Sequence, residues 1–246
     1  MAPKGPFRGC ERSSHKMPSV SFGSAVRPEK SRGPRLAAAL LVAALHLSWT
    51  SGQAFAEAPP VKLLAFGDSL VHGYGLAAGD SFPEQLEGAL RERGYSVKVI
   101  NAGNSGDTTA AGRARLDWAL AEEPDLVLVE LGGNDSLRGI EPSDTYRNLD
   151  GILRRLTADG LPVLLAGMRA PRNLGDDYAA EFDAVFPRLA EKHGVAFYPF
   201  FLDGVALDPA LNQADGIHPN AAGVAVIVER ILPALEPLLR ELVADG

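Results

Sequence analysis

Five short apolar runs alternate with longer stretches of helical periodicity from residue 61 onward, and this alternation constrains the fold more than any other feature. The runs lie at residues 61–66, 97–100, 126–131, 163–166 and 195–198. They are nearly continuous in apolar residues, as is typical of strands that are buried on both faces of a parallel sheet. Helical patterns separate and follow them, at residues 81–93, 110–122, 144–159, 177–193 and 221–243.

This order of elements predicts an α/β protein, a three-layer α/β/α sandwich around a mostly parallel sheet of five strands. Pro233 and Pro237 fall inside the last helical pattern and are expected to kink or divide it. No internal repeat or second domain boundary interrupts the alternation. Residues 57–246 are therefore expected to form a single domain.

Residues 1–56 have the composition of a signal peptide and leader. They are basic and rich in Ser, Pro and Gly up to residue 35, apolar over residues 36–47 apart from His46, and end in an A-x-A site. The apolar run is too short for a transmembrane helix, which needs about 20 residues. We expect cleavage near Ala56/Glu57, a periplasmic or secreted protein, and no stable membrane insertion afterwards. An uncleaved anchor or a disordered tail is the alternative interpretation.

Charge and cysteine content exclude several classes of function. The leader holds eight of the 24 Lys and Arg and two of the 31 Asp and Glu, so the remainder has a formal net charge of −13. Such an acidic chain is a poor partner for nucleic acid or an anionic membrane. The single cysteine, Cys10, lies in the leader. The predicted domain therefore has no thiol nucleophile, no disulfide and no cysteine metal site.

A Gly-Asp-Ser turn at residues 67–69 follows the first apolar run directly. It places the Ser69 hydroxyl at the carboxyl end of a strand, where ligands bind in open α/β sheets. The turn alone is weak evidence, because Gly and Asp are common in turns of every kind. The G-x-S-x-G elbow of α/β-hydrolases is absent, since Val71 occupies the place of its second glycine.

The general base for such a serine can be sought by elimination. After the leader, the chain contains three histidines: His72, His193 and His218. A base also needs a carboxylate that orients it. Asp215 precedes His218 by three residues, a spacing that one helical turn brings to the same side. His193 stands at a predicted helix end, where capping is the simpler role, and His72 is expected at the rim. Ser69, His218 and Asp215 are therefore the predicted nucleophile, base and orienting acid.

Two further loops follow the second and third predicted strands. They contain Gly103 and the Gly-Gly-Asn-Asp sequence at residues 132–135. Either loop alone could be a turn that needs a positive φ. In a doubly wound sheet, however, the ends of the first three strands converge near the switch point. Gly103 and Asn134 are therefore candidate donors to an oxyanion formed beside Ser69.

These motifs together identify a family that the chain resembles, the SGNH (GDSL) hydrolases, and within it the bacterial thioesterase I, arylesterase and lysophospholipase branch. The resemblance extends from residue 61 to about residue 242. It rests on FGDSL at 66–70, GNSG at 103–106, GGND at 132–135, LRG at 137–139, MRAPRNLG at 168–175 and DGIHP at 215–219.

The resemblance implies a flavodoxin-like sheet and a mechanism that needs no metal and no cofactor. By position it makes Ser69 the nucleophile, His218 the base and Asp215 its orienting acid. The oxyanion hole would consist of the Ser69 N–H, the Gly103 N–H and the Asn134 side-chain amide. The implied activity is that of a serine esterase that hydrolyses aryl or acyl esters through an acyl-enzyme, with thioesters and lysophospholipids as further candidate substrates.

The acyl group of such a substrate would contact the loops after the third and fourth strands. Their candidate contact residues are Leu137, Ile140, Met168 and Leu174. The alternative interpretation is that these side chains only seat the loops on the sheet. A carbohydrate O-deacetylase with the same catalytic residues is the main alternative function. A non-catalytic nucleotide-binding module is disfavoured, because no G-x-G-x-x-G follows a strand and no P-loop sequence occurs.

Overall fold

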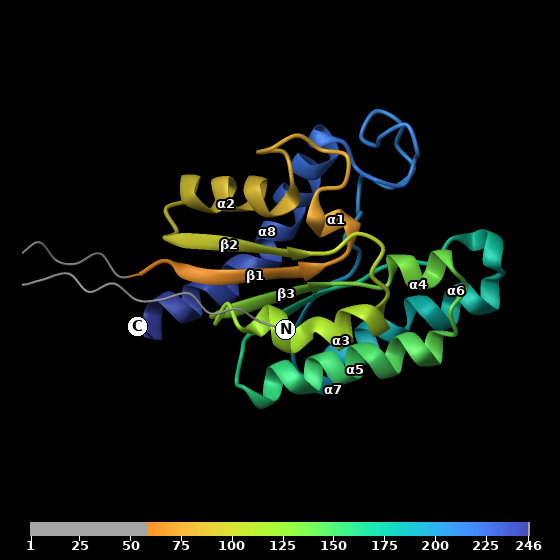
Figure 1. Ribbon diagram of the computed structural model, residues 1–246, viewed down its shortest axis with the longest axis horizontal. Helices are drawn as coiled ribbons and strands as arrows, with labels where there is room; N and C mark the ends of the chain where they lie inside the picture. The colour runs from red at the N-terminus through yellow and green to blue at the C-terminus, as the bar shows by residue number, and fades with distance from the viewer. Residues whose placement is uncertain (1–58, 246) are drawn as a thin grey trace, which may run out of the picture. The chain divides into compact units, whose positions relative to one another are not determined.

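Five parallel strands form the centre of the protein (Figure 1), whose computed structural model describes residues 59–245. The sheet order is β2-β1-β3-β4-β5, and all adjacent strands pair in parallel. The strands are β1 Val61–Gly67, β2 Val97–Gly103, β3 Leu126–Glu130, β4 Val163–Ala166 and β5 Ala196–Tyr198. The predicted α/β class and all five predicted strands are thereby confirmed. The predicted leader and its cleavage site lie outside the described residues.

Helices cover both faces of this sheet. Figure 1 shows α2 and α8 on one side and α3, α5 and α7 on the other, which confirms the predicted three layers. None of the helices within residues 59–245 is long and apolar enough to cross a membrane. The helices are α1 Ser69–His72, α2 Phe82–Glu92, α3 Thr109–Leu120, α4 Gly133–Leu137, α5 Pro142–Ala158, α6 Asp176–Asp183, α7 Val185–His193 and α8 Ala221–Asp245, with a 3₁₀ turn, η1, at Arg172–Leu174.

The central strands are apolar because helices exclude water from both of their faces. Every residue of β3 is buried, and so are the last five residues of β1. Five phenylalanines, all almost fully buried, fill much of the space between sheet and helices: Phe66, Phe82, Phe182, Phe186 and Phe201. One residue of β3 departs from this apolar rule, since its last residue is the fully buried Glu130.

The position of β1 in the sheet brings three segments of the chain together. β1 pairs with β2 on one side and with β3 on the other. Its last residue, Gly67, lies in register with Gly103 of β2 and Glu130 of β3. The chain continues from β1 into α1, from β2 into the loop before α3, and from β3 into α4. These three segments start side by side at the carboxyl edge of the sheet, where ligands bind in open α/β folds.

Two helical predictions differ from the structure. The pattern at residues 177–193 forms two helices, α6 and α7, which meet at Ala184. The sequence predicts that the prolines kink or divide the last helix; the division is wrong, because α8 continues through Pro233 and Pro237. Each proline removes one backbone donor. Burial of the neighbouring apolar side chains keeps the segment helical, and these include Ile231, Leu232, Leu235 and Leu239.

The short helix α1 lies directly over the end of β2 because Gly103 has no side chain. A Cβ at Gly103 would stand 2.2 Å from the backbone nitrogen of His72 and 2.7 Å from its Cα. Real Cβ contacts of this length do not occur, and backbone atoms cannot move aside as a flexible side chain can. The glycine therefore fixes how closely the segment that contains Ser69 approaches the sheet.

We expect Gly103→Ala to lower the free energy of unfolding by about 1–3 kcal/mol, the usual cost of forcing extra atoms into a packed site. Gly88→Ala is the matched control. Gly88 lies on the exposed side of α2, and a Cβ there meets no atom within 4 Å. This control should gain roughly 0.5–1 kcal/mol from better helix propensity. Urea titration measures both values, and equal stability of the two variants would contradict the argument.

Candidate active site

The predicted nucleophile, Ser69, is the first residue of α1, and Asp68 alone separates it from the end of β1. The sharp change of direction is stabilised by Asp68, whose side chain accepts a hydrogen bond of 3.0 Å from the Leu70 N–H. The helix ends after one turn at Gly73, which has a left-handed φ of 86°. This tight turn leaves Ser69 partly exposed at the edge of the sheet while its neighbours on both sides are buried.

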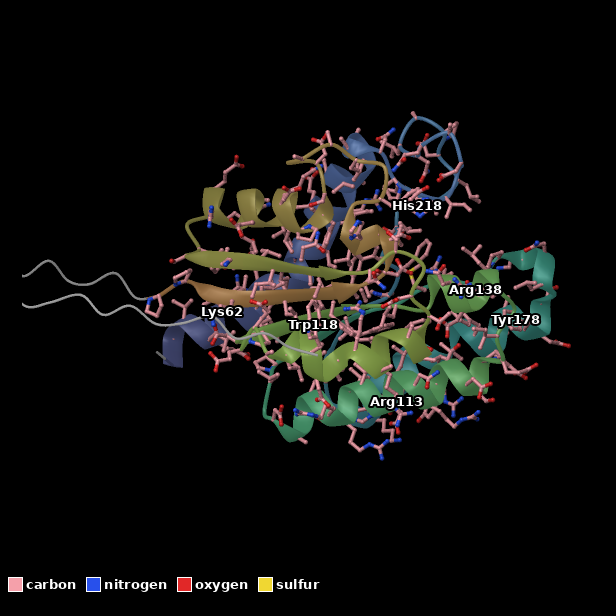
Figure 2. The ribbon with its side chains drawn as sticks, in the orientation of Figure 1. Lys62, Arg113, Trp118, Arg138, Tyr178 and His218 are labelled. Carbon is pink, nitrogen blue, oxygen red and sulfur yellow. The ribbon has the colours of Figure 1, made fainter. Side chains whose placement is uncertain are left out.

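The predicted base reaches Ser69 from a distant part of the chain. His218 lies in the segment between β5 and α8, and its Nε2 is 2.9 Å from the Ser69 Oγ. The Nδ1 of the same ring is 2.7 Å from Oδ2 of Asp215. Ser69, His218 and Asp215 thus form a continuous hydrogen-bonded chain, the arrangement that makes a serine hydroxyl nucleophilic. Figure 2 shows His218 at the end of the molecule where the sheet's loops gather.

Asp215 is held ionised by its own segment. Its Oδ1 accepts hydrogen bonds from the backbone N–H groups of Ile217 at 2.9 Å and His218 at 3.0 Å. These two bonds, followed by the bond from the imidazole, lower the pKa of Asp215 to about 2. The ionised carboxylate therefore accepts a hydrogen bond from the Nδ1–H of His218 at ordinary pH. The proton on Nδ1 leaves Nε2 free to accept the Ser69 proton.

Gln213 fixes the segment that contains Asp215 and His218, and sequence reasoning missed it. Its side chain donates to the carbonyls of Tyr74 at 2.8 Å and Pro219 at 3.0 Å. Its backbone N–H donates to the His218 carbonyl at 2.7 Å. The Tyr74 ring also lies 4.7 Å from the His218 ring, centroid to centroid. These contacts attach the base to the turn that follows the nucleophile.

The other two histidines lie outside this hydrogen-bonded chain. His193, at the end of α7, pairs through Nε2 with Oδ1 of Asp150 on α5 at 2.7 Å. His72 is exposed, and its Nδ1 is 3.3 Å from the Gly103 carbonyl oxygen. Within residues 59–245 no three His, Cys, Asp or Glu side chains are grouped in a way that could hold a metal ion.

Two of the predicted oxyanion donors are placed suitably. The Ser69 N–H has no acceptor among the described residues. Asn134 is partly buried at the start of α4, and its Nδ2 donates to Oδ2 of Asp68 at 2.9 Å. This bond uses one of the two hydrogens of the amide and leaves the other for a ligand. Because the Asp68 carboxylate accepts this bond, the amide nitrogen of Asn134, rather than its oxygen, lies on the side of Asp68.

The prediction of Gly103 as an oxyanion donor requires correction. Its N–H already donates to the Asn101 side-chain oxygen at 3.0 Å, so it is not free for a ligand. Gly106 in the same loop is the better candidate: its N–H has no acceptor within residues 59–245, and its φ is +85°. Its carbonyl accepts a bond of 2.9 Å from Arg138, the residue after α4. The second glycine of the GNSG motif was the available sequence signal.

The four predicted acyl-contact residues separate into two groups. Leu137 is 52% exposed and Leu174 is 39% exposed, which leaves both available to a ligand. Ile140 is half-buried, and its carbonyl accepts a hydrogen bond of 2.8 Å from the Tyr178 hydroxyl. Met168 is only 5% exposed and packs in the main core, which favours the alternative interpretation of a side chain that seats the loop.

Comparison with known proteins agrees with this geometry. A model described as the GDSL-like Lipase/Acylhydrolase family matches residues 65–226, a span that contains Ser69, Asn134, Asp215 and His218. The esterase TesA of Pseudomonas aeruginosa is 41% identical over 203 residues, which cover 82% of this chain and 99% of that protein. The thioesterase 1/protease 1/lysophospholipase L1 of Escherichia coli K12 is 40% identical over 186 residues, which cover 75% of this chain and 88% of that enzyme.

The fold agrees as well. The crystal structure of AlinE4, an SGNH-hydrolase family esterase, has 50% sequence identity and a TM-score of 0.62, with coverage of 72% of this chain and 96% of that one. The matched span, the level of identity and the shared fold leave one conclusion: the chain belongs to the GDSL-like lipase/acylhydrolase family.

Proposed function

We propose that the protein is a serine esterase that hydrolyses carboxylic esters through an acyl-enzyme intermediate. The observation that carries this proposal is the continuous chain of hydrogen bonds from Ser69 through His218 to Asp215. Relatives named esterase and thioesterase/lysophospholipase, each about 40% identical, support the same chemistry. The acyl group would come from aryl or alkyl esters, with thioesters and lysophospholipids as further substrates to test.

The reaction uses the site as follows. His218 Nε2 takes the Ser69 proton while Oγ attacks the ester carbonyl carbon. The imidazolium that forms is stabilised by the ionised Asp215. His218 then returns the proton to the leaving alcohol, and the acyl group remains on Ser69. Water, activated in turn by His218, attacks this acyl-enzyme and releases the carboxylic acid.

The negative oxygen formed in each step needs donors that are already in place. We assign this role to the Ser69 N–H, the free hydrogen of the Asn134 amide and the Gly106 N–H. Two are backbone groups fixed by turns, and the third is fixed by its bond to Asp68. Because their orientation is set before the substrate arrives, little reorganisation accompanies the appearance of charge.

We also propose that the protein is exported and acts in the periplasm or outside the cell. The sequence of residues 1–56, with its basic, apolar and A-x-A parts, supports this. Expressed with its leader in a bacterial host, the exported protein is expected to begin at or near Glu57. Amino-terminal sequencing decides the matter, and a mature start upstream of residue 36 would contradict cleavage at the A-x-A site.

Removal of the triad members tests the mechanism. Ser69→Ala and His218→Ala should each lower kcat by about 10⁶-fold, whereas Asp215→Ala should lose only about 10⁴-fold, because it orients and stabilises the imidazole without exchanging a proton with substrate. Steady-state hydrolysis of a chromogenic ester gives these values. His72→Ala is the control and should retain kcat. A loss in His72→Ala with activity retained in His218→Ala would identify a different base.

The acyl preference tests the substrate class. Leu137, the last residue of α4, and Leu174, the last residue of η1, are exposed apolar side chains in the segments that follow β3 and β4. Each CH₂ buried against them contributes about 0.8 kcal/mol, or roughly fourfold in kcat/KM. We therefore expect kcat/KM to rise as the acyl group lengthens beyond acetyl, until the contact surface is full. A series of p-nitrophenyl esters measures this rise.

Leu174→Ser should flatten that rise more than it lowers the hydrolysis of the acetyl ester. Val243→Ser is the matched control, because Val243 is 58% exposed in the last turn of α8. Figure 1 shows this end of α8 at the opposite end of the sheet from the active site. The control should leave the whole series unchanged. An optimum at acetyl with an immediate fall for longer chains would instead favour a sugar O-deacetylase.

A further inference from the structure

Two carboxyl groups lie buried side by side beneath the nucleophile. Glu130, the last residue of β3, is completely buried, and Asp68, beside Ser69, is 1% exposed. The Asp68 N–H donates to Oε2 of Glu130 at 3.3 Å. Oε1 of Glu130 has no hydrogen-bond partner among the described residues. Two negative charges this close in a buried site cannot both persist, so the pair must retain a proton.

The surroundings of each carboxyl decide which one holds the proton. The Asp68 carboxyl accepts two hydrogen bonds, one from the Leu70 N–H at 3.0 Å and one from the Asn134 amide at 2.9 Å. Within residues 59–245, Glu130 accepts only one. Burial raises the pKa of both groups, and for Glu130 the neighbouring charge of Asp68 raises it further. A hydrogen bond donated by the Glu130 carboxyl to Asp68 would lower the pKa of Asp68 and raise that of Glu130. Asp68 therefore keeps the charge and Glu130 the proton.

The glycine of the Gly-Asp-Ser turn makes room for this pair. A Cβ at Gly67 would lie 2.6 Å from Oε2 of Glu130 and 2.4 Å from a methyl group of Val71. Any larger residue would therefore displace the Glu130 carboxyl from its present position. The glycine thus leaves the Glu130 carboxyl room to lie against the backbone of Asp68.

We propose that Glu130 is a positioning residue for catalysis: as a carboxylic acid it donates a hydrogen bond to Asp68, and so fixes the carboxylate that orients the Asn134 amide toward the oxyanion. The inference rests on the proposed function, because Asn134 has a catalytic role only if an oxyanion forms. Glu130 itself does not touch the substrate and acts only through Asp68 and Asn134.

A pair of variants separates positioning from filling of space. Glu130→Gln keeps a donor for Asp68 and an acceptor for its N–H, whereas Glu130→Met keeps the shape but removes both functions. We expect Glu130→Met to lower kcat by roughly 10–100-fold with little change in KM, because a small misplacement of a catalytic group costs up to about 10²-fold. Glu130→Gln should restore most of this loss. If both variants lose equally, the proposal is wrong.

A double-mutant cycle tests whether Glu130 works through Asn134. Asn134→Ala alone should lower kcat by about 10²–10³-fold. Adding Glu130→Met to it should then cause almost no further loss, because the amide to be oriented is gone. An equal loss in both backgrounds would overturn the role of Glu130 and leave the esterase proposal intact. An Asn134→Ala enzyme with full kcat would instead remove the oxyanion role of Asn134.

The protonated acid can also be detected without any assay of activity. At neutral pH the wild-type protein should show the infrared C=O stretching band of a buried carboxylic acid, and Glu130→Gln should lack it. Glu130→Gln preserves the size and the hydrogen bonds of the pair, so this comparison remains available if Glu130→Met does not fold. Absence of the band from the wild-type protein would overturn the proposal.

Discussion

The pairing of β1 with both β2 and β3 is the constraint on which the active site depends. Gly67 lies in register with Gly103 on one side and Glu130 on the other, so three chain segments leave the sheet within two strand widths. One segment presents Ser69 and another presents Asn134. Strands about 4.8 Å apart bring these side chains within reach of a single carbonyl group without any long connection. The sheet thus places Ser69 and Asn134, while His218 and Asp215 come from the segment before α8.

The sequence was sufficient to predict the sheet and the triad, and the reasons are physical. Continuous apolar runs that are separated by helical patterns have few interpretations other than buried strands. The five strands of the sheet could therefore be predicted. Ser69, His218 and Asp215 followed because a serine hydrolase needs particular residue types and the domain contains few histidines. Both inferences use signals that a linear sequence preserves: periodicity over many residues, and the chemical identity of rare side chains.

The rest depended on short-range geometry that leaves little trace in sequence. α1 and α4 contain four and five residues, too few to show helical periodicity. Gly103 was mistaken for a free donor because the bond from its N–H to Asn101 depends on one side-chain rotamer. Met168 lies on a predicted loop but is buried, and nothing in an isolated apolar residue tells the two states apart. Gln213 acts through bonds to carbonyls that only the folded chain brings near.

Neighbouring residues of α4 fix the site in two directions. Asn134 bonds to Asp68 beneath the nucleophile, as described above. The next residue, Asp135, is completely buried and points to the other side, where it accepts bonds from the Thr109 N–H at 2.8 Å, the Thr109 hydroxyl at 2.5 Å and the Thr145 hydroxyl at 3.2 Å. A buried carboxylate is costly unless its oxygens are satisfied in this way. Asp135 therefore stabilises the structure only when α3 and α5, which contain Thr109 and Thr145, pack beside α4. The position of Asn134 in α4 thus depends on the packing of these helices.

The two halves of the site meet different physical requirements. Reaction at Ser69 needs atoms placed within a fraction of an ångström, so the irregular segment before α8 is fixed by polar bonds from Gln213 and Asp215. Recognition of an acyl chain needs only apolar area, because hydrophobic contact has no preferred direction. Exposed side chains such as Leu137 and Leu174 can supply that area without precise bonds. If the proposed acyl contact is made by these side chains, changes at their positions alter substrate preference while the hydrogen-bonded centre stays as it is.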